Sequence, residues 1–184
     1  MLKENESRLQ LKLNSILSPE AEVDYRDLSS IIDVASLQAL MDDHNRITKM
    51  PMAIMDLKGK LLVCSGWQDI CTKFHRSNEE AKRFCFESDI VVSRNLRPGE
   101  IVAYRCKHGL IDVVTPLYIG DKHVANLFTG QFFYNEDEVD EQTFLAQAER
   151  YGFDAGEYLE ALHRVPRFSH ELVDAYMRRW PTTP

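Results

Sequence analysis

The sequence lacks the features that mark several large classes of protein. Its 184 residues include only eight glycines and seven prolines, which excludes a collagen-like or low-complexity chain. No apolar run approaches the ~20 residues that cross a membrane, and the first ten residues, MLKENESRLQ, do not have the pattern of a signal peptide. We therefore expect a soluble globular protein of the cytoplasm that does not bind membranes.

Basic residues are also in short supply. Lysine and arginine number 22 against 29 aspartates and glutamates, which gives a formal net charge of −7. A nucleic-acid-binding domain would carry a basic stripe, and an anionic lipid surface would repel an acidic chain. Nucleic acids and membranes are therefore not expected partners. The length corresponds to one domain with extensions.

Cysteine is sparse, and no two cysteines form a C-x-x-C pair. The four are Cys64, Cys71, Cys85 and Cys106. This spacing argues against a disulfide scaffold and favours a reducing compartment. Free cysteines commonly behave as small buried hydrophobes. Cys71 lies four residues before His75, however, and Cys106 lies two before His108, so each pair can share one face of its helix or strand. Thiolate and imidazole groups bind Zn²⁺ and iron, so a metal site stays open as an alternative to a plain core.

Signatures of catalysis are absent too. The sequence has no G-x-S-x-G, no H-E-x-x-H, no Walker A motif and no G-x-G-x-x-G after a strand. Cys106 stands between Arg105 and Lys107, and neighbouring cations can activate a thiol. Adjacent side chains of a strand point to opposite faces, so those charges need not reach the sulfur. We expect no enzyme; Cys106 as a nucleophile, with His108 or His75 as its base, is the alternative.

What is present is a regular alternation of helical and strand patterns. A helical stripe near the N-terminus ends at Ser18-Pro19, because the residue before proline avoids the α conformation. It comprises Leu9, Leu13, Ile16 and Leu17. The stripe predicts either a docked amphipathic helix or a short coiled coil that makes the protein a homodimer. Residues 1–27 are therefore expected to form a signalling linker helix and connector, residues 28–180 a sensor domain, and residues 181–184 a tail.

The central part of the chain predicts a sheet interrupted by helices. Ser36 can cap a helix that runs to about Thr48, and Ser77 with Glu80 forms a capping box inside the helical stretch 66–95. Strands are expected at Met52–Asp56, Lys60–Ser65, Ile101–Cys106, Leu110–Tyr118 and Val124–Phe133. Helices are expected at Glu138–Tyr151, Ala155–Leu162 and from Ser169 to about Trp180.

This order predicts an α+β fold. About five antiparallel strands are flanked by helices, and a helical insert separates strands 2 and 3. Such a layout is typical of PAS- and GAF-like sensor domains, by analogy of fold alone. Gly130, inside an apolar strand, predicts a bulge or a close backbone approach.

Aromatic and polar residues gather in the sheet and insert regions, which is the composition of a small-molecule pocket. The aromatics are Trp67, Phe74, Phe84, Tyr104, Phe128 and Phe132, and the polar candidates are Cys106, His108, Thr129 and Gln131. Aromatic side chains dominate ordinary cores as well, so a plain core is the alternative for each of them.

Four stretches together resemble the PocR sensory domain. They are S-G-W-Q-D-I-C-T-K-F-H at 65–75, C-F-E-S-D at 85–89, Y-R-C-K-H-G-L at 104–110 and G-Q-F at 130–132. The resemblance covers roughly residues 28–180. It implies a PAS-like ligand-binding fold in prokaryotic signalling proteins such as histidine kinases, with simple hydrocarbon derivatives as ligands. Residues 8–20 resemble the linker that precedes sensor domains in such kinases.

We therefore expect a cytoplasmic small-molecule sensor, cut from a longer protein that supplies a downstream kinase or regulator. The ligand-binding residues are predicted to be Trp67, Cys71, Phe74, Cys85, Tyr104, Cys106, His108 and Gln131. The alternative is a metal or redox sensor that binds zinc or iron through Cys71, Cys85, Cys106 and His108. These four residues match the cysteine-bearing pattern of the family. The identity of any cofactor stays open.

Overall fold

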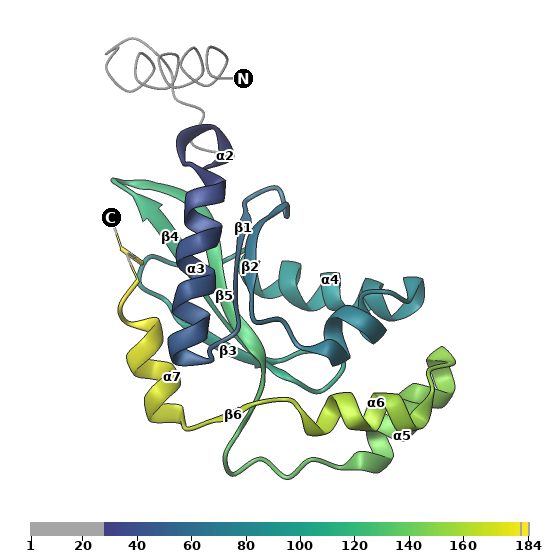
Figure 1. The fold of residues 1–184 in the computed structure, drawn as a ribbon. Coiled ribbons are helices and arrows are strands. Elements are labelled where there is room, and N and C mark those ends of the chain that lie inside the picture. Colours follow the sequence, from purple (N-terminus) through teal and green to yellow (C-terminus); the bar gives the residue numbers. More distant parts are fainter. Residues whose placement is uncertain (1–27, 181, 184) are drawn as a thin grey trace.

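The computed structural model describes residues 28–180, 182 and 183 and builds them around one sheet (Figure 1). Five strands lie in the order β2-β1-β5-β4-β3, each antiparallel to its neighbours, and a short β6 pairs with β5 in parallel. Their bounds are β1 Met52–Asp56, β2 Leu61–Ser65, β3 Val102–Arg105, β4 Ile111–Ile119, β5 Lys122–Tyr134 and β6 Arg167–Phe168.

The predicted α+β, PAS/GAF-like sheet flanked by helices is confirmed. Two strands precede the helical insert and three follow it, as the alternation of apolar residues indicated. The structure also contains β6, which was not predicted because its two residues are too few to show an alternation of apolar and polar side chains. The helices are α2 Leu28–Ile31, α3 Val34–Thr48, the π-helix η1 Ile70–His75, α4 Glu79–Ser93, α5 Glu141–Tyr151, α6 Ala155–His163 and α7 His170–Met177. The predicted linker helix lies outside the described residues.

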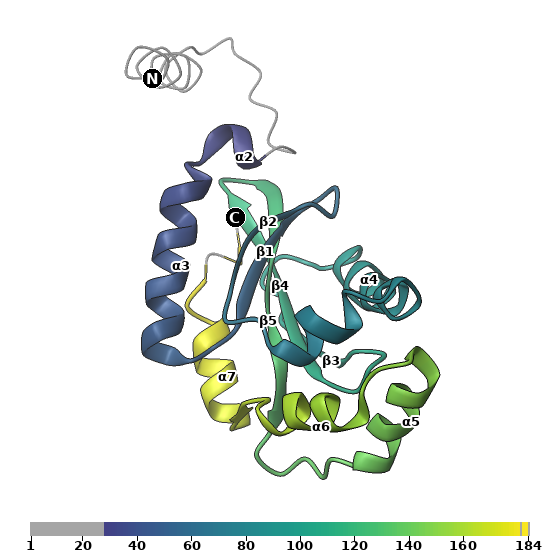
Figure 2. The same cartoon turned by 45° about the vertical axis from the view of Figure 1, so that its right-hand side comes forward.

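The sheet separates two layers of helix, which Figure 2 shows edge-on. Helices α3 and α7 cover one face, where Met41 and Met177 pack against Ile54 and Phe132 in the largest apolar cluster. Helix α4 covers the other face, where Phe128 and its neighbours form a smaller cluster. Helices α5 and α6 pack with η1 at the lower end of the sheet. Within the described residues, every helix is too short or too polar to span a bilayer.

Two helix caps differ from the prediction. Asp33, not Ser36, caps α3: its carboxylate accepts hydrogen bonds from the backbone of Ala35 and Ser36. Asn78, not Ser77, caps α4 by accepting from Glu80 and Ala81. Ser77 instead donates its hydroxyl to backbone carbonyls of the preceding helix, because η1 ends immediately before it. Helix α5 likewise begins at Glu141, after the cap Asp140, and not at Glu138.

These caps give a direct test. Replacing Asn78 with alanine is expected to lower the free energy of unfolding by about 1 kcal/mol, because two backbone N–H groups of α4 lose their acceptor. The neighbouring Ser77→Ala is the matched control and is expected to cost less than about 0.5 kcal/mol. Urea denaturation of both variants measures the difference. A larger loss for Ser77→Ala would restore the sequence-based assignment of the cap.

Strand β5 contains a bulge beside β4. Gly130 pairs with Asp112 and Phe132 pairs with Ile111, so Gln131 has no partner across the ladder. Gln131 has a φ of 67°, an uncommon backbone conformation for a residue with a side chain. Any side chain at Gly130 would collide with the carboxyl group of Asp112. The structure thus shows both the bulge and the close approach that the glycine predicts.

Candidate functional site

A pocket lies against the sheet face that α4 covers. It encloses about 20 Å³, close to the space that one water molecule requires. Strands β1, β4 and β5 form its floor, and residues before η1, after η1 and on α4 form its walls. The lining residues are Met52, Ala53, Met55, Trp67, Arg76, Asp89, Asp112, Phe128, Gly130 and Gln131. We call it the Arg76–Asp112 pocket.

A charged pair forms one wall of this pocket. Arg76 donates from a terminal guanidinium nitrogen to Asp89 across 2.9 Å, and the guanidinium lies 4.5 Å above the ring of Trp67. The hydroxyl of Tyr104 donates to the other Asp89 oxygen across 3.1 Å. Burial raises the pKa of Asp89 and Arg76 opposes that rise. The Asp89 carboxylate therefore depends on Arg76 for its charge balance.

One buried N–H donor of Arg76 has no acceptor. Its Nε is buried and makes no hydrogen bond to any described residue. A buried guanidinium N–H without an acceptor is costly, and such groups call for an explanation such as a water, an ion or a ligand. Since Arg76 lines the pocket, a small molecule held there is one way to supply the missing acceptor.

Asp112 supplies a second carboxyl group. It is only partly exposed, and burial together with the nearby Asp89 raises its pKa to about 8, against the opposing effect of Arg76. The missing side chain of Gly130 gives it room. At neutral pH Asp112 is therefore mostly protonated. It can donate a hydrogen bond into the pocket, or accept one after losing its proton.

The backbone around the pocket is irregular at two points that contact each other. The side-chain carbonyl of Gln131, the bulge residue, accepts from the backbone N–H of Gln68 across 2.6 Å. Gln68 begins the turn that leads into η1, and the backbone N–H of Arg76 closes η1 on the carbonyl of Cys71. Short π-helical segments frequently occur at functional sites. The bulge and the π-helix together set the position of Arg76.

Beside this pocket lies a buried histidine pair. The rings of His75 and His108 stack with centroids 4.1 Å apart, and both side chains are almost fully buried. His75 Nε2 lies 2.6 Å from the hydroxyl of Tyr158, while His108 Nε2 lies 2.9 Å from the carbonyl of Ala81. Burial lowers the pKa of His75 to about 2, with smaller contributions from His108 and Arg76, and burial also lowers the pKa of His108. Both rings are therefore neutral: His75 joins η1 to α6, and His108 joins the turn between β3 and β4 to α4 and α5.

The predicted site residues divide between these two places. Trp67 and Gln131 line the pocket, and Tyr104 reaches it through Asp89. Cys71, Phe74 and His108 lie in the histidine-pair region instead, whereas Cys106 packs against that region and also hydrogen-bonds the pocket residue Asp112. Cys85 is buried in α4, outside the pocket lining.

The three charged residues of the pocket, Arg76, Asp89 and Asp112, were not among the predicted site residues. Asp112 carried a readable signal, since an acid between Ile111 and Val113 interrupts an otherwise apolar strand. Asp89 ends the C-F-E-S-D stretch that resembles the PocR sensory domain, whereas Arg76 carried no signal, because charged residues in helical segments are ordinarily solvated. Their pairing depends on how η1 packs against α4, 13 residues along the chain.

The surroundings of three cysteines favour protonated thiols. Burial raises the pKa of Cys71 and of Cys106, and it raises that of Cys85 to about 11, so the thiols stay protonated. Both ring nitrogens of His108 already lie within hydrogen-bonding distance of protein oxygens. In the part of the chain that the structure describes, no group of three or more histidine, cysteine or acidic side chains is arranged to hold a metal ion. The zinc or iron site stays a prediction.

Comparison with known proteins gives one match. The family model described as the sensory domain found in PocR matches residues 30–180. Neither the curated proteins nor the solved structures contain a significant match. The matched region includes all of the pocket and the histidine pair.

Proposed function

The chain belongs to the family of sensory domains found in PocR, and from this membership we propose that it binds a small organic molecule in the Arg76–Asp112 pocket and reports its presence within a signalling protein. Apolar walls with a few placed polar groups are the usual composition of a small-molecule site. The observation that supports the proposal most directly is that Arg76, a pocket-lining residue, has a buried Nε without an acceptor. A hydrocarbon derivative with polar groups would supply one. The host is proposed to be a cytoplasmic histidine kinase or regulator.

The sheet offers a route from the pocket to the helices on its other face. Strand β1 places Ala53 and Met55 on the pocket side and Ile54 on the side of α3 and α7. A ligand that prefers one of two strand positions would shift the balance between two arrangements of those helices. Helices α3 and α7 lie near the two ends of the described chain, where further domains would attach.

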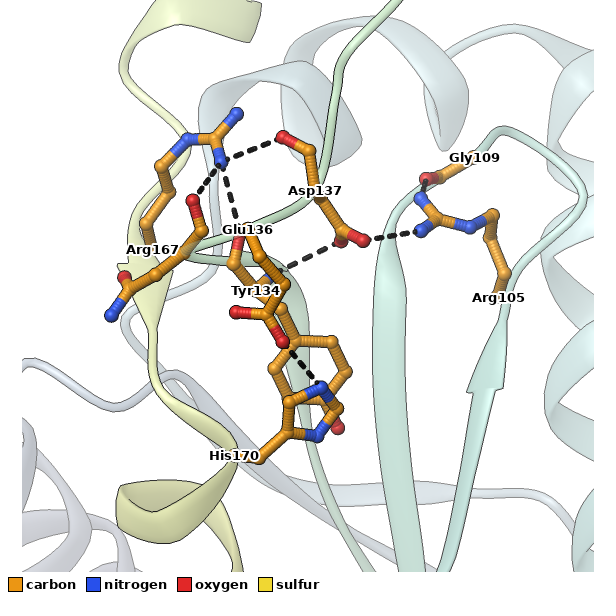
Figure 3. Close-up of polar contacts among 8 residues, drawn as sticks. Arg105, Gly109, Tyr134, Glu136, Asp137, Arg167 and His170 are labelled. Atoms are coloured by element: carbon orange, nitrogen blue, oxygen red, sulfur yellow. Dashed lines mark hydrogen bonds and ion pairs between the residues drawn. The ribbon is translucent and has the colours of Figure 1, made fainter.

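A second route runs along β5 to α7 (Figure 3). Arg167 donates one guanidinium nitrogen to the backbone carbonyls of Tyr134, Asn135 and Asp137, at 2.9 to 3.2 Å. The Asp137 side chain also accepts from Arg105 at the end of β3. This clamp ties the end of the pocket strand to the segment that leads into α7.

The first turn of α7 contacts the same clamp. The ring of His170 stacks on Tyr134 with centroids 3.5 Å apart, and its Nε2 lies 2.7 Å from Glu136. A displacement of β5 at the pocket would therefore be transmitted to α7 through direct contacts between side chains. We propose α7 as the output helix of the domain.

Ligand screening by thermal unfolding tests the proposal. Small alcohols, diols, amines and short-chain acids are each added to the purified chain, and a compound present at 100 times its Kd is expected to add about 2.7 kcal/mol of stability. Arg76→Gln is expected to abolish the shift. Arg178→Gln, at the exposed residue that follows α7, is the matched control and should keep it. If no compound stabilises the folded wild type, the pocket is not a small-molecule site.

A further inference from the structure

The charges around the pocket are unequal. Two carboxyl groups, Asp89 and Asp112, face a single guanidinium, Arg76. Asp89 holds that guanidinium at 2.9 Å. Among the described residues, no cationic group lies within ion-pair distance of Asp112. With Asp112 protonated the three groups have no net charge, and with Asp112 ionised they have a charge of −1, so neither state attracts an anion and the ionised state attracts a cation.

The position of Asp112 fits a ligand contact. Its strand neighbours Ile111 and Val113 are buried apolar residues, and the β5 residue opposite it is Gly130. The backbone N–H of Gln131 and the thiol of Cys106 donate hydrogen bonds to its carboxyl group, and both contacts favour the ionised form. Burial outweighs them and raises the pKa, so the carboxylate still lacks the charged partner that a bound ammonium group would supply.

A second polar group fixes the other end of the occupant. The Nε of Arg76 is a donor and accepts nothing, so the occupant must present a lone pair there. Trp67 and Phe128 close the sides with aromatic surface, which tolerates a nearby cation. The enclosed volume of about 20 Å³ restricts the occupant to a very small molecule.

Resting on the proposed function, we propose that the ligand is a small amino alcohol, whose ammonium group pairs with Asp112 and whose hydroxyl oxygen accepts from Arg76 Nε. No covalent bond forms or breaks. The protonated carboxyl group of Asp112 gives its proton to the buffer as the ammonium group arrives, so one neutral site and one cation become an ion pair plus a released proton.

Proton release distinguishes this ligand from an uncharged one. Because the pKa of Asp112 in the empty pocket is about 8, roughly 0.9 proton is released for each ammonium bound at pH 7. The apparent affinity is expected to rise about tenfold between pH 6 and pH 7 and to level off above pH 8. An alkyl ammonium with a pKa of about 9 or more keeps its charge over this range. A neutral diol releases no proton and binds with no such slope.

Isothermal titration calorimetry of the full chain tests the proposal. The probes are 1-aminopropan-2-ol, propane-1,2-diol and lactate, which share one carbon skeleton and differ in charge, and each is titrated in two buffers of different ionisation enthalpy. We expect the amino alcohol to bind tightest and with proton release. Asp112→Asn is expected to weaken it by roughly 30-fold or more and to leave the diol within about threefold.

The outcomes separate the two proposals. If the diol binds as tightly as the amino alcohol and no proton is released, or if lactate binds tightest, the ammonium assignment is overturned and the sensor function stands. If none of the three probes binds and the wider screen is also negative, both proposals fail. If Asp112→Asn does not fold, the pH series on the wild-type chain decides, because a flat affinity from pH 6 to pH 8 contradicts the ammonium–Asp112 pair.

Discussion

Replacing Arg76 with methionine is expected to lower the free energy of unfolding by about 3 kcal/mol or more. The substitution keeps much of the apolar stem but removes the only cation within ion-pair distance of Asp89 among the described residues. Asp89 is buried in α4 and retains only the hydroxyl of Tyr104 as a donor. Removing one member of a buried pair is costly because the other is left as an uncompensated charge.

A double variant separates charge from packing. In Arg76→Met/Asp89→Leu no buried charge is left over, so most of the lost stability is expected to return. Urea denaturation of the wild type, both single variants and the double variant completes the cycle. A loss below about 1 kcal/mol for Arg76→Met would show that Asp89 is solvated in the folded protein, contrary to its position in the pocket wall.

Acid is expected to destabilise the chain through His75. Burial lowers its folded-state pKa to about 2, whereas an unfolded histidine titrates near 6.5. Below pH 6.5, His75 therefore binds a proton in the unfolded chain but stays neutral in the folded chain. The stability due to the neutral ring is complete above pH 6.5 and falls by about 1.4 kcal/mol for each pH unit below it, or about 2.7 kcal/mol at pH 4.5.

The difference between wild type and His75→Phe isolates this effect. Phenylalanine keeps the stacking partner of His108 but does not titrate, so the gap between the two free energies of unfolding should shrink as pH falls from 6.5 to 4.5. Asp89 and Asp112 contribute with the opposite sign, because their folded pKa values are raised, and they cancel in the difference. Parallel curves for the two proteins would mean that His75 is protonated in the fold at pH 4.5.

Most of the fold could be predicted because it depends on local patterns. Alternating apolar residues marked β1, β2, β3, β4 and β5, and glycines at Gly59, Gly109 and Gly120 marked their turns, where each has a positive φ. The caps of α3 and α4 were misplaced by one to three residues. Serine, aspartate and asparagine can all cap a helix, and the choice between neighbours depends on where the preceding segment ends.

The site was predictable only in part. Trp67, Tyr104 and Gln131 were expected from the aromatic and polar composition, and they lie in or beside the pocket. The pairing of Arg76 with Asp89 and the approach of Asp112 to both depend on the packing of η1, α4 and β4, which no local pattern encodes. The family pattern of cysteines pointed to the buried region around His108, which is adjacent to the pocket.

The extra residue at the Gln131 bulge reverses which face of the sheet the following side chains of β5 point to. Before it, Phe128 and Gly130 face the pocket and Leu127 faces α7; after it, Phe132 faces the α7 side and Phe133 packs with α5 and α6. If residues 127–133 alternated without the extra residue, Phe132 would face the pocket and Phe133 the main core, because adjacent side chains of a strand point to opposite faces. Deleting Gln131 would remove the bulge and leave Phe132 opposite Ile111, so the loss would be the contact between the Gln131 side chain and the backbone of Gln68 that joins β5 to the start of η1.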